Sequence, residues 1–345
     1  MNKRETEIDI LRLLAMLCVI WVHVGGIETS TLPTSDANCQ WLIFLKSIMT
    51  WEVPVYVMIS GRFFLDPERE ISFNKILKSI WRLVIAFIVW DVVYQVYYIL
   101  TGTYTNLNWK GILSQTLIGP YHFWFLYMIV GLYIITPFLR KITEEKRLSE
   151  YFIALFFVFV LLIKYCVKLP LIGSTLDGIL NSMNMNFVLG YSGYFVLGYY
   201  LRRYPLSDKF EKTLYVLSAG LLIGSALANT VCSVREGVYT ERFTGYTNPN
   251  TIVVAATIYT LFTKRISKVR FSVKITRLIS VVSEHSFGIY LLHALVLGVF
   301  ATVGVKPTVL HPLIAMPLIT LLTFVVTIII VTIIRKIPKI GKAII

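Results

Sequence analysis

Long apolar runs dominate the chain, and short polar stretches separate them. Runs of about 17 to 25 apolar residues are long enough to cross the hydrocarbon core of a bilayer as helices. The pattern predicts an all-α polytopic membrane protein with ten such spans in a single domain that covers residues 1–345. We expect these spans near residues 8–27, 41–61, 79–101, 121–139, 151–167, 186–201, 213–232, 250–263, 280–300 and 313–334.

The distribution of basic residues supports this number of spans. With ten spans, both termini lie on the same side of the membrane, and loops rich in Lys and Arg alternate with loops that are poor in them. Most of the 33 Lys and Arg residues then fall on one side, which the positive-inside rule identifies as the cytoplasm. The net charge of +14 therefore reflects membrane topology, and we expect no nucleic-acid partner.

The composition agrees with a chain that lies mostly in lipid. Hydrophobic residues make up 56% of it and charged residues only 15%, against roughly 25% charged residues in a soluble domain. The four cysteines do not form the framework of a disulfide-rich protein. Cys39, Cys166 and Cys232 all fall near the predicted outer face. The sequence therefore leaves open whether two of these three cysteines form a disulfide.

The first span carries ionisable side chains, which are costly in hydrocarbon and usually face a bundle interior or a water-filled cavity. Arg12 and His23 are eleven residues apart, so they share one helix face at a separation of about 16 Å along the axis. We expect them to line one path through the protein. The alternatives are that Arg12 extends to the interface beside Asp9, and that His23 is a hydrogen-bonded interfacial histidine.

Two carboxyl groups lie at mid-depth in the second and third predicted spans. Glu52 and Asp91 are expensive there unless they are paired or protonated. Lys46, six residues before Glu52, is a candidate partner. A structural ion pair or an interhelical hydrogen bond is the alternative to a functional role for these groups.

The second span also contains residues that interrupt or crowd a helix. Pro54 removes a backbone hydrogen bond at mid-membrane. Ser60 and Gly61 permit either a break or the close approach of a neighbouring helix.

The fourth and ninth spans carry further polar aromatic groups. Tyr121, His122 and Trp124 lie near the predicted outer end of the fourth span, where an aromatic belt is the common explanation. His285 and His293 are eight residues apart in the ninth span and lie near one face. No His spacing matches the i, i+4 pair of a zinc site, so we predict no metal. The sequence also contains no phosphate-binding loop and no nucleophile elbow.

Four segments occur in a fixed order along the chain. They read IDILRLLAMLCVIWVH, VPVYVMISG, YHFWFLYMIVGLYIITPFL and SEHSFGIYLLHALV. Together they resemble the signatures of the acyltransferase 3 family of integral membrane acyltransferases, and they cover the chain from its first span to its ninth. The likeness is closest to the surface-polysaccharide O-acetyltransferases, the branch that includes the enterobacterial common antigen acetyltransferase.

The resemblance implies an activity and a location. Members transfer an acyl group, usually acetyl, from cytoplasmic acyl-coenzyme A to a sugar hydroxyl, commonly on a lipid-linked or cell-surface glycan. This implies a multi-pass protein of a bacterial plasma membrane, with acetyl-CoA as the donor substrate and the lipid bilayer as its surroundings. Matches to the family's motifs fall on Arg12, His23, Pro54, Ser60, Gly61, Trp124, Tyr290 and His293.

The third span departs from the family pattern. Many members carry R-x-x-R at its start, where this chain reads KILKSIWRL. Ser79 stands at the first arginine position and Arg82 at the second. Lys78 can supply a point charge without the bidentate fork of arginine, which weakens the expected contact with the coenzyme phosphates.

A mechanism follows from the resemblance and from the chemistry of these residues. A sugar hydroxyl needs a base in the transition state, and we expect His23 to be that base, oriented by Glu52 or by Asp91. The oxyanion that forms from the thioester needs a donor, and we expect it to be Ser60, Trp124, Tyr290 or His293. The expected catalytic residues are Arg12, His23, Glu52, Ser60, Trp124 and His293, the coenzyme anchors Arg12, Lys78, Arg82 and Arg140, and the substrate-binding residues Asp91, His122, Trp124 and Tyr290.

Two other classes of function would use the same intramembrane polar groups. A transporter or flippase of a lipid-linked glycan would need them without an acyl donor. A structural or sensory membrane subunit would tolerate their substitution. Within the acyltransferase class, the acceptor can also be peptidoglycan, an antibiotic or a lipid headgroup.

Overall fold

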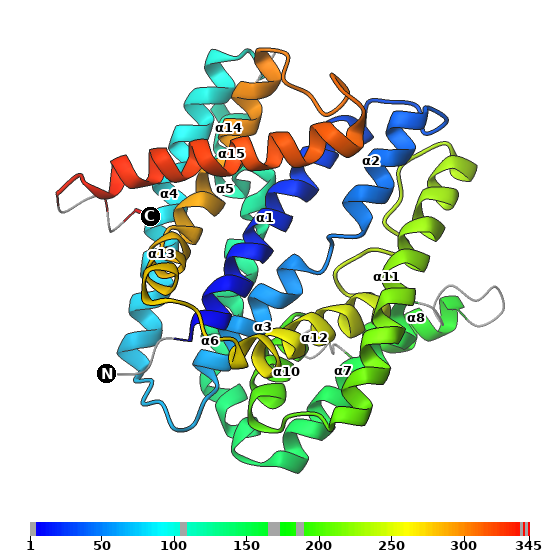
Figure 1. Ribbon diagram of the computed structural model, residues 1–345, viewed down its shortest axis with the longest axis vertical. Helices are drawn as coiled ribbons and strands as arrows, with labels where there is room; N and C mark the ends of the chain where they lie inside the picture. The colour runs from blue at the N-terminus through cyan, green and yellow to red at the C-terminus, as the bar shows by residue number, and fades with distance from the viewer. Residues whose placement is uncertain (1–4, 104–108, 165–172, 184–189, 339–340, 342–343) are drawn as a thin grey trace.

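The computed structural model describes residues 5–103, 109–164, 173–183, 190–338, 341 and 344–345. This part of the chain is helical and contains no strand (Figure 1). The elements are α1 (Thr6–Thr29), α2 (Ala37–Ser47), α3 (Glu52–Phe64), α4 (Phe73–Leu100), α5 (Trp109–Ile118), η1 (Tyr121–Phe123), α6 (Trp124–Glu144), α7 (Lys146–Lys164), α8 (Gly173–Ser182), α10 (Ser192–Arg203), α11 (Asp208–Glu236), α12 (Pro249–Lys264), η3 (Ile266–Lys268), α13 (Val273–Ser283), α14 (Ser286–Thr302) and α15 (Pro312–Arg335).

Helices occupy all ten predicted ranges, but not all of these helices are long and apolar enough to cross a bilayer alone. Within the described residues, six stretches meet that test, and α13 with α14 makes a seventh if this pair, bent by 58°, is one span. The six are Thr6–Thr29, Ala37–Phe64, Phe73–Leu100, Tyr121–Glu144, Asp208–Glu236 and Pro312–Arg335. The ranges on α7, α10 and α12 do not meet it, and residues 165–167 and 186–189 lie outside the described part. The number ten and the placement of the termini stay predictions.

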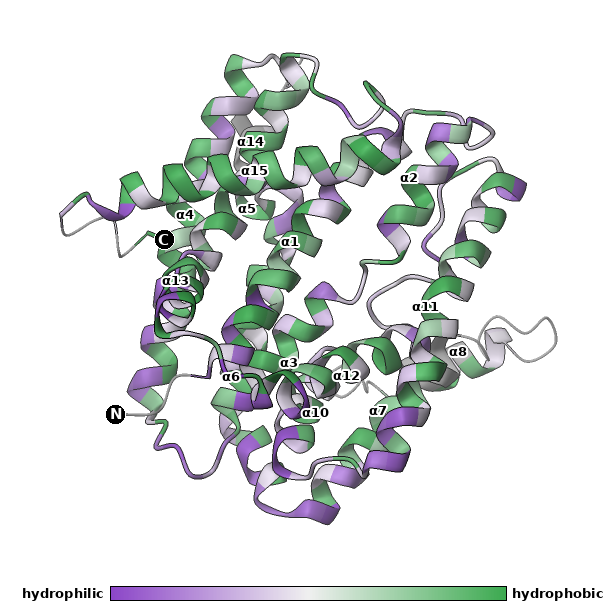
Figure 2. Cartoon of the chain, in the orientation of Figure 1, coloured by the Kyte–Doolittle hydropathy of each residue, from purple (hydrophilic) through white to green (hydrophobic). Residues whose placement is uncertain are grey.

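The hydropathy of the helices indicates a multi-pass membrane protein. Figure 2 shows hydrophobic residues along most of the helix lengths, with hydrophilic residues gathered toward the lower edge of the view. Many large apolar side chains on the outside of the bundle are exposed, among them Trp81 and Phe138. In water such a surface would be costly, whereas in lipid it is the ordinary outer surface of a helix bundle.

Helix α1 lies at the centre of the molecule and packs on two separate cores (Figure 1). Leu11 and Ala15 belong to the core formed with α3, α6, α7, α10 and α12. Met16 and Ile20 belong to the core formed with α2, α4, α6, α14 and α15. A helix that is apolar on most of its circumference is expected in such a central position. Its few polar residues must therefore meet polar partners inside the bundle.

The second predicted span is broken between α2 and α3, ahead of Pro54 and not at Ser60–Gly61. Helix α2 ends at Ser47, residues 48–51 form turns, and α3 begins at Glu52. Pro54 lies in the first turn of α3, where a missing N–H costs nothing because the first amides of a helix have no intrahelical partner. Ser60 lies within the regular part of the helix. The break therefore places the amino end of a helix inside the span.

Helices α3 and α10 cross at very close range through two glycines. A Cβ atom on Gly61 would lie 1.8 Å from the carbonyl oxygen of Phe195, and one on Gly198 would lie 2.1 Å from that of Met58. Small residues at such crossings let two helix backbones approach closely in a membrane. The close approach that the sequence predicted at Gly61 is confirmed, and it fixes the position of α3.

The cysteines form no disulfide among the described residues. Cys18 and Cys39 are buried free thiols, and Cys232 is a half-buried one. Cys39 is therefore not paired with Cys232. Cys166 lies outside the described residues.

We predict that Gly61→Ala destabilises the fold, because the added methyl group would overlap the backbone of α10. Overpacking of this kind costs about 1–3 kcal/mol. The apparent melting temperature of the detergent-solubilised protein measures the effect. Gly220→Ala on α11 is the matched control, since a Cβ there meets nothing within 4 Å. Equal stability of the two variants would contradict the close crossing of α3 and α10.

Candidate active site

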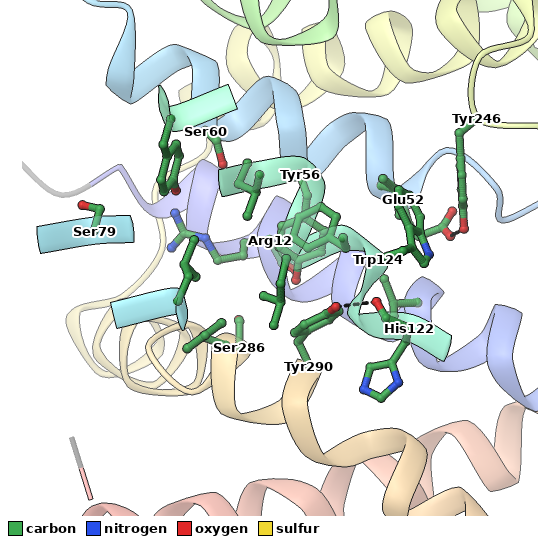
Figure 3. Close-up of a pocket in the computed structure, with 18 of the residues that line it drawn as sticks. Arg12, Glu52, Tyr56, Ser60, Ser79, His122, Trp124, Tyr246, Ser286 and Tyr290 are labelled. Atoms are coloured by element: carbon green, nitrogen blue, oxygen red, sulfur yellow. Dashed lines mark hydrogen bonds between the residues drawn. The ribbon is translucent and has the colours of Figure 1, made fainter. Parts of the chain in front are cut away.

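One cavity of about 390 Å³ runs alongside α1 between the two cores. We call it the arginine cavity because Arg12 and Arg82 line it. Figure 3 shows Arg12 and Ser79 toward one end of it, and Arg82 follows Ser79 by one turn of α4. Its polar lining residues are Arg12, His23, Glu52, Tyr56, Ser60, Ser79, Arg82, His122, Trp124, Tyr133, Tyr246, Ser286 and Tyr290. Arg12 and His23 both line it, as their eleven-residue spacing on α1 predicts.

Arg12 is held in place by two polar neighbours. Its Nη1 lies 3.2 Å from Asp9 Oδ1 and 3.1 Å from Ser283 Oγ, and the Ser283 hydroxyl donates to Asp9 Oδ1 at 2.8 Å. Asp9 is thus the local partner of Arg12 that the sequence allowed. The Arg12 side chain keeps 28% of its surface exposed, and a guanidinium has five N–H donors. It can therefore also contact an anionic ligand in the cavity.

Helix α4 adds Ser79 and Arg82 to the same end of the cavity, one helical turn apart. Arg82 Nη2 donates to the carbonyl oxygen of Ile345 at 3.0 Å, and its guanidinium lies 5.4 Å from the centre of the Phe287 ring. Lys78 is exposed and does not line the cavity. Ser79 thus stands in the cavity lining at the position where the resemblance implies the first arginine of the R-x-x-R motif.

Arg140 does not lie in the cavity lining. Its guanidinium donates to three backbone carbonyl oxygens, those of Phe64, Asp66 and Arg69, each at 2.9 Å. These carbonyls belong to the end of α3 and the loop that leads to α4. Arg140 therefore stabilises the connection between α3 and α4, a structural role that the sequence did not predict.

Glu52 lies at the other end of the arginine cavity and is almost fully buried. Its partner is Tyr246, whose hydroxyl donates to Glu52 Oε1 at 2.7 Å (Figure 3). Glu52 is also the first residue of α3, where the helix dipole stabilises negative charge. The predicted partner was wrong, because Lys46 pairs instead with Glu241 at 3.2 Å.

Tyr246 belongs to the loop between α11 and α12, residues 237–248, which we call the α11–α12 loop. Hydrogen bonds between residues that flank this loop and its own backbone hold it in shape. Asn250 Nδ2 donates to the carbonyl of Phe243 at 2.7 Å, and the Thr251 hydroxyl donates to that of Gly245 at 3.0 Å. The Lys46–Glu241 ion pair ties the loop to α2. The loop thus presents Tyr246 to the middle of the bundle.

A second cavity of about 610 Å³ continues from the His23 end of the first. We call it the tyrosine cavity. Its polar and aromatic lining residues are His23, Lys46, Tyr94, Tyr97, Tyr98, Thr103, Tyr121, Trp124, Glu241 and Tyr246. The lining thus combines aromatic faces with hydroxyl groups and a single ion pair.

Three residues line both cavities: His23, Trp124 and Tyr246. The Trp124 ring stacks on the Tyr246 ring with their centres 5.7 Å apart, and Trp124 makes no hydrogen bond within the described residues. An aromatic belt at the membrane interface therefore explains only part of the cluster of Tyr121, His122 and Trp124, because Trp124 lines both cavities. The two cavities meet at an imidazole, an indole N–H and a phenol, and this junction is the candidate active site.

Two further histidines surround His23. Its ring centre lies 5.1 Å from that of His293 and 6.3 Å from that of His122. His122 lines the arginine cavity, whereas His293 is fully buried behind His23 and lines neither cavity. No group of three His, Cys, Asp or Glu side chains in the described part of the chain has the geometry to hold a metal ion.

The carboxylates expected to orient His23 do not contact it. Neither Glu52 nor Asp91 forms a hydrogen bond with His23 among the described residues, and Asp91 accepts one from Gln95 at 3.0 Å. Asp91 lines neither cavity. Of the expected oxyanion donors, Ser60 and Trp124 line the arginine cavity. The Tyr290 hydroxyl lines it too, but it already donates to the carbonyl oxygen of His122 at 2.6 Å.

Sequence reasoning missed Tyr246, Ser283 and the role of Glu241. The one available signal was the cost of a lone carboxylate at Glu52, which predicts that a partner exists. It cannot say which of the 20 tyrosines supplies the hydroxyl, because that depends on how the α11–α12 loop folds.

A comparison with protein families identifies the family of the chain. The family model described as an acyltransferase domain, that of the acyltransferase 3 family, matches residues 5–336. The chain therefore belongs to this family of acyltransferases. No curated protein and no solved structure matches the chain.

We predict that Arg140→Lys lowers the stability of the protein without weakening the binding of an acyl donor. A lysine ammonium lacks the planar fork that reaches the three carbonyl oxygens, and hydrogen bonds from a charged group contribute about 1.5–3 kcal/mol each. Melting temperature and acyl-coenzyme A binding should be measured on the same detergent sample. Lys141→Ala is the control, because Lys141 is an exposed neighbour on α6. Weaker donor binding at unchanged stability would instead make Arg140 a coenzyme anchor.

Proposed function

We propose that this protein is a membrane O-acyltransferase that moves an acetyl group from cytoplasmic acetyl-CoA to a hydroxyl of a lipid-linked or cell-surface glycan. The observation that carries the proposal is that His23 lines both cavities. An imidazole at the junction of two binding chambers can contact a donor in one and an acceptor in the other. Membership of the acyltransferase 3 family supplies the class of reaction.

The arginine cavity suits the donor. Arg12 and Arg82 lie at the same end, and guanidinium groups bind phosphate through paired hydrogen bonds. Arg12 and His23 are about 16 Å apart along α1, a distance that an extended pantetheine arm can bridge. Between them the walls are mostly apolar and aromatic, including Phe64 and Ile129. The phosphates would stay at the arginine end while the thioester reaches His23.

The tyrosine cavity suits a sugar acceptor. Aromatic faces bind the apolar faces of sugar rings, and phenol hydroxyls hydrogen-bond with sugar hydroxyls. Tyr94, Tyr97, Tyr98 and Tyr121 provide both kinds of contact. Among the described residues of the lining, Lys46 and Glu241 are the only charged groups, and they neutralise each other in an ion pair. Its volume of about 610 Å³ is in the usual range for small-molecule sites.

The chemical step is an attack of the acceptor hydroxyl on the thioester carbonyl. His23 takes the proton as the new C–O bond forms, and the collapse of the tetrahedral intermediate breaks the C–S bond. The proton on His23 then passes to the coenzyme thiolate, so no other reactant is needed. The indole N–H of Trp124 lines both cavities and is the candidate donor to the oxyanion at their junction, whereas Ser60 lies with Arg12 toward the arginine end (Figure 3).

We predict that His23→Ala lowers acetyl transfer by at least about 100-fold, because the hydroxyl loses its base. Membranes that contain the protein are incubated with labelled acetyl-CoA, and label is counted in lipid, lipid-linked glycan and polymeric glycan. Size-exclusion profiles show whether the variant still folds. His311→Ala, which changes a histidine outside both cavities, should transfer at the wild-type rate.

Other outcomes of this assay separate the rival functions. Full transfer by His23→Ala would refute the role of His23 as base. Label in peptidoglycan or in a lipid headgroup would replace the glycan as acceptor. No labelled product from the wild-type protein, together with movement of a lipid-linked glycan across the membrane, would favour a flippase.

We predict that Arg82→Gln raises the KM for acetyl-CoA by about tenfold and leaves kcat within about twofold, because a phosphate contact remote from the chemistry contributes similarly to ground-state and transition-state binding. Initial rates at saturating acceptor provide both constants. Lys75→Gln removes a charge from an exposed position on the same helix and should leave the KM unchanged. A lower kcat at constant KM would place Arg82 at the reacting centre instead.

A further inference from the structure

The hydrogen-bond partners of His293 fix its tautomer. Its Nδ1 lies 2.7 Å from the carbonyl oxygen of Tyr290 and 3.2 Å from that of Ile289. Carbonyl oxygens only accept hydrogen bonds, so Nδ1 must carry the hydrogen. In a neutral imidazole the other nitrogen, Nε2, is then an acceptor with a bare lone pair. The preceding turn of α14 thus holds both the ring and its protonation pattern.

This acceptor is buried and has no partner within the described residues. A buried acceptor without a donor is costly, so a nearby N–H should serve it. Two rings are close enough to do so. The ring centre of His23 lies 5.1 Å from that of His293, and the ring centre of His122 lies 5.0 Å from it.

The freedom of its ring favours His23 over His122 as the donor. A hydrogen bond of about 2.9 Å between two imidazoles needs only the N–H···N axis to lie in both ring planes, and both ring-centre distances allow it. His122 is buried, and the rings of Tyr94, Phe123 and Tyr290 pack edge-on against it. His23 is only half-buried at the edge of both cavities, so its ring has room to turn its N–H toward His293.

We propose that His293 is a positioning residue that accepts a hydrogen bond from His23 and fixes the tautomer of His23. The second nitrogen of His23 is then bare and faces the junction of the cavities, where the acceptor hydroxyl would be deprotonated. The role of this nitrogen as base rests on the proposed function, whereas the tautomer does not. A neutral histidine serves here in place of the carboxylate that commonly orients a catalytic histidine, so no further charge is buried.

Histidine tautomers can be measured directly in this protein, because it has only five histidines. The probe is a long-range proton–nitrogen correlation spectrum of protein labelled with ¹⁵N-histidine in detergent micelles, with assignment by single substitution. We expect His23 to be one neutral tautomer in the wild-type protein. His293→Asn keeps a polar atom near the Nδ1 position but removes the Nε2 acceptor, so His23 should become a mixture of tautomers.

Two further variants complete this measurement. His293→Gln places an amide carbonyl near the Nε2 position and should restore a single tautomer at His23. His285→Asn is the matched control, because His285 Nδ1 lies 2.6 Å from the carbonyl of Val281 in the same kind of contact but outside the histidine cluster. It should leave the His23 signals unchanged. An unchanged single tautomer of His23 in His293→Asn would overturn the proposal.

Kinetics test the consequence for catalysis. His293→Asn should lower kcat at least about tenfold with the KM for acetyl-CoA within about twofold, and His293→Gln should recover part of the loss. The double variant with His23→Ala should be no slower than His23→Ala alone, because His293 acts through His23. Full additivity of the two losses would contradict this. A wild-type protein that transfers no acetyl group would overturn the proposed function. The tautomer of His23 measured by NMR would still show whether His293 accepts a hydrogen bond from it.

Discussion

A carboxyl group inside a helix bundle needs a partner, and the partner of Glu52 shapes the centre of this protein. The hydroxyl of Tyr246 reaches Glu52 from the α11–α12 loop, which must fold inward to make the contact. Trp124 then stacks on Tyr246, and these two rings together with His23 form the wall that both cavities share. The cost of an unpaired polar group in an apolar environment thus determines where the two cavities meet.

The helix framework makes this arrangement possible. The break between α2 and α3 places Glu52 at the amino end of a helix within the second span, where the helix dipole favours its charge. The close crossing at Gly61 and Gly198 fixes α3 against α10. Helix α1 separates two apolar cores and turns Arg12 and His23 toward the same cavity. The crossing of α3 with α10 and the packing of α1 between the two cores therefore hold Glu52, Arg12 and His23 along one cavity.

The sequence predicts some of these features well because they depend on local periodicity. Apolar run length locates the helices, and an eleven-residue spacing places Arg12 and His23 on one face. The sequence could not locate the break before Glu52, since the turn at residues 48–51 contains neither glycine nor proline and Ser60–Gly61 allowed a break elsewhere. Nor could it assign partners. Tyr246 for Glu52 and Glu241 for Lys46 come from distant parts of the chain, and tertiary packing alone selects them among many similar residues.

The proposed function places the arginine cavity on the cytoplasmic side and the tyrosine cavity on the opposite side, with His23 where they meet. Thiol accessibility tests it most directly. In a chain whose four cysteines are replaced by serine, Ser60→Cys marks the arginine cavity and Tyr97→Cys marks the tyrosine cavity. A membrane-impermeant thiol reagent is then applied to inside-out and to right-side-out vesicles. We predict that Ser60→Cys reacts only in inside-out vesicles and Tyr97→Cys only in right-side-out vesicles. Reaction of both cysteines from the same side would contradict the account.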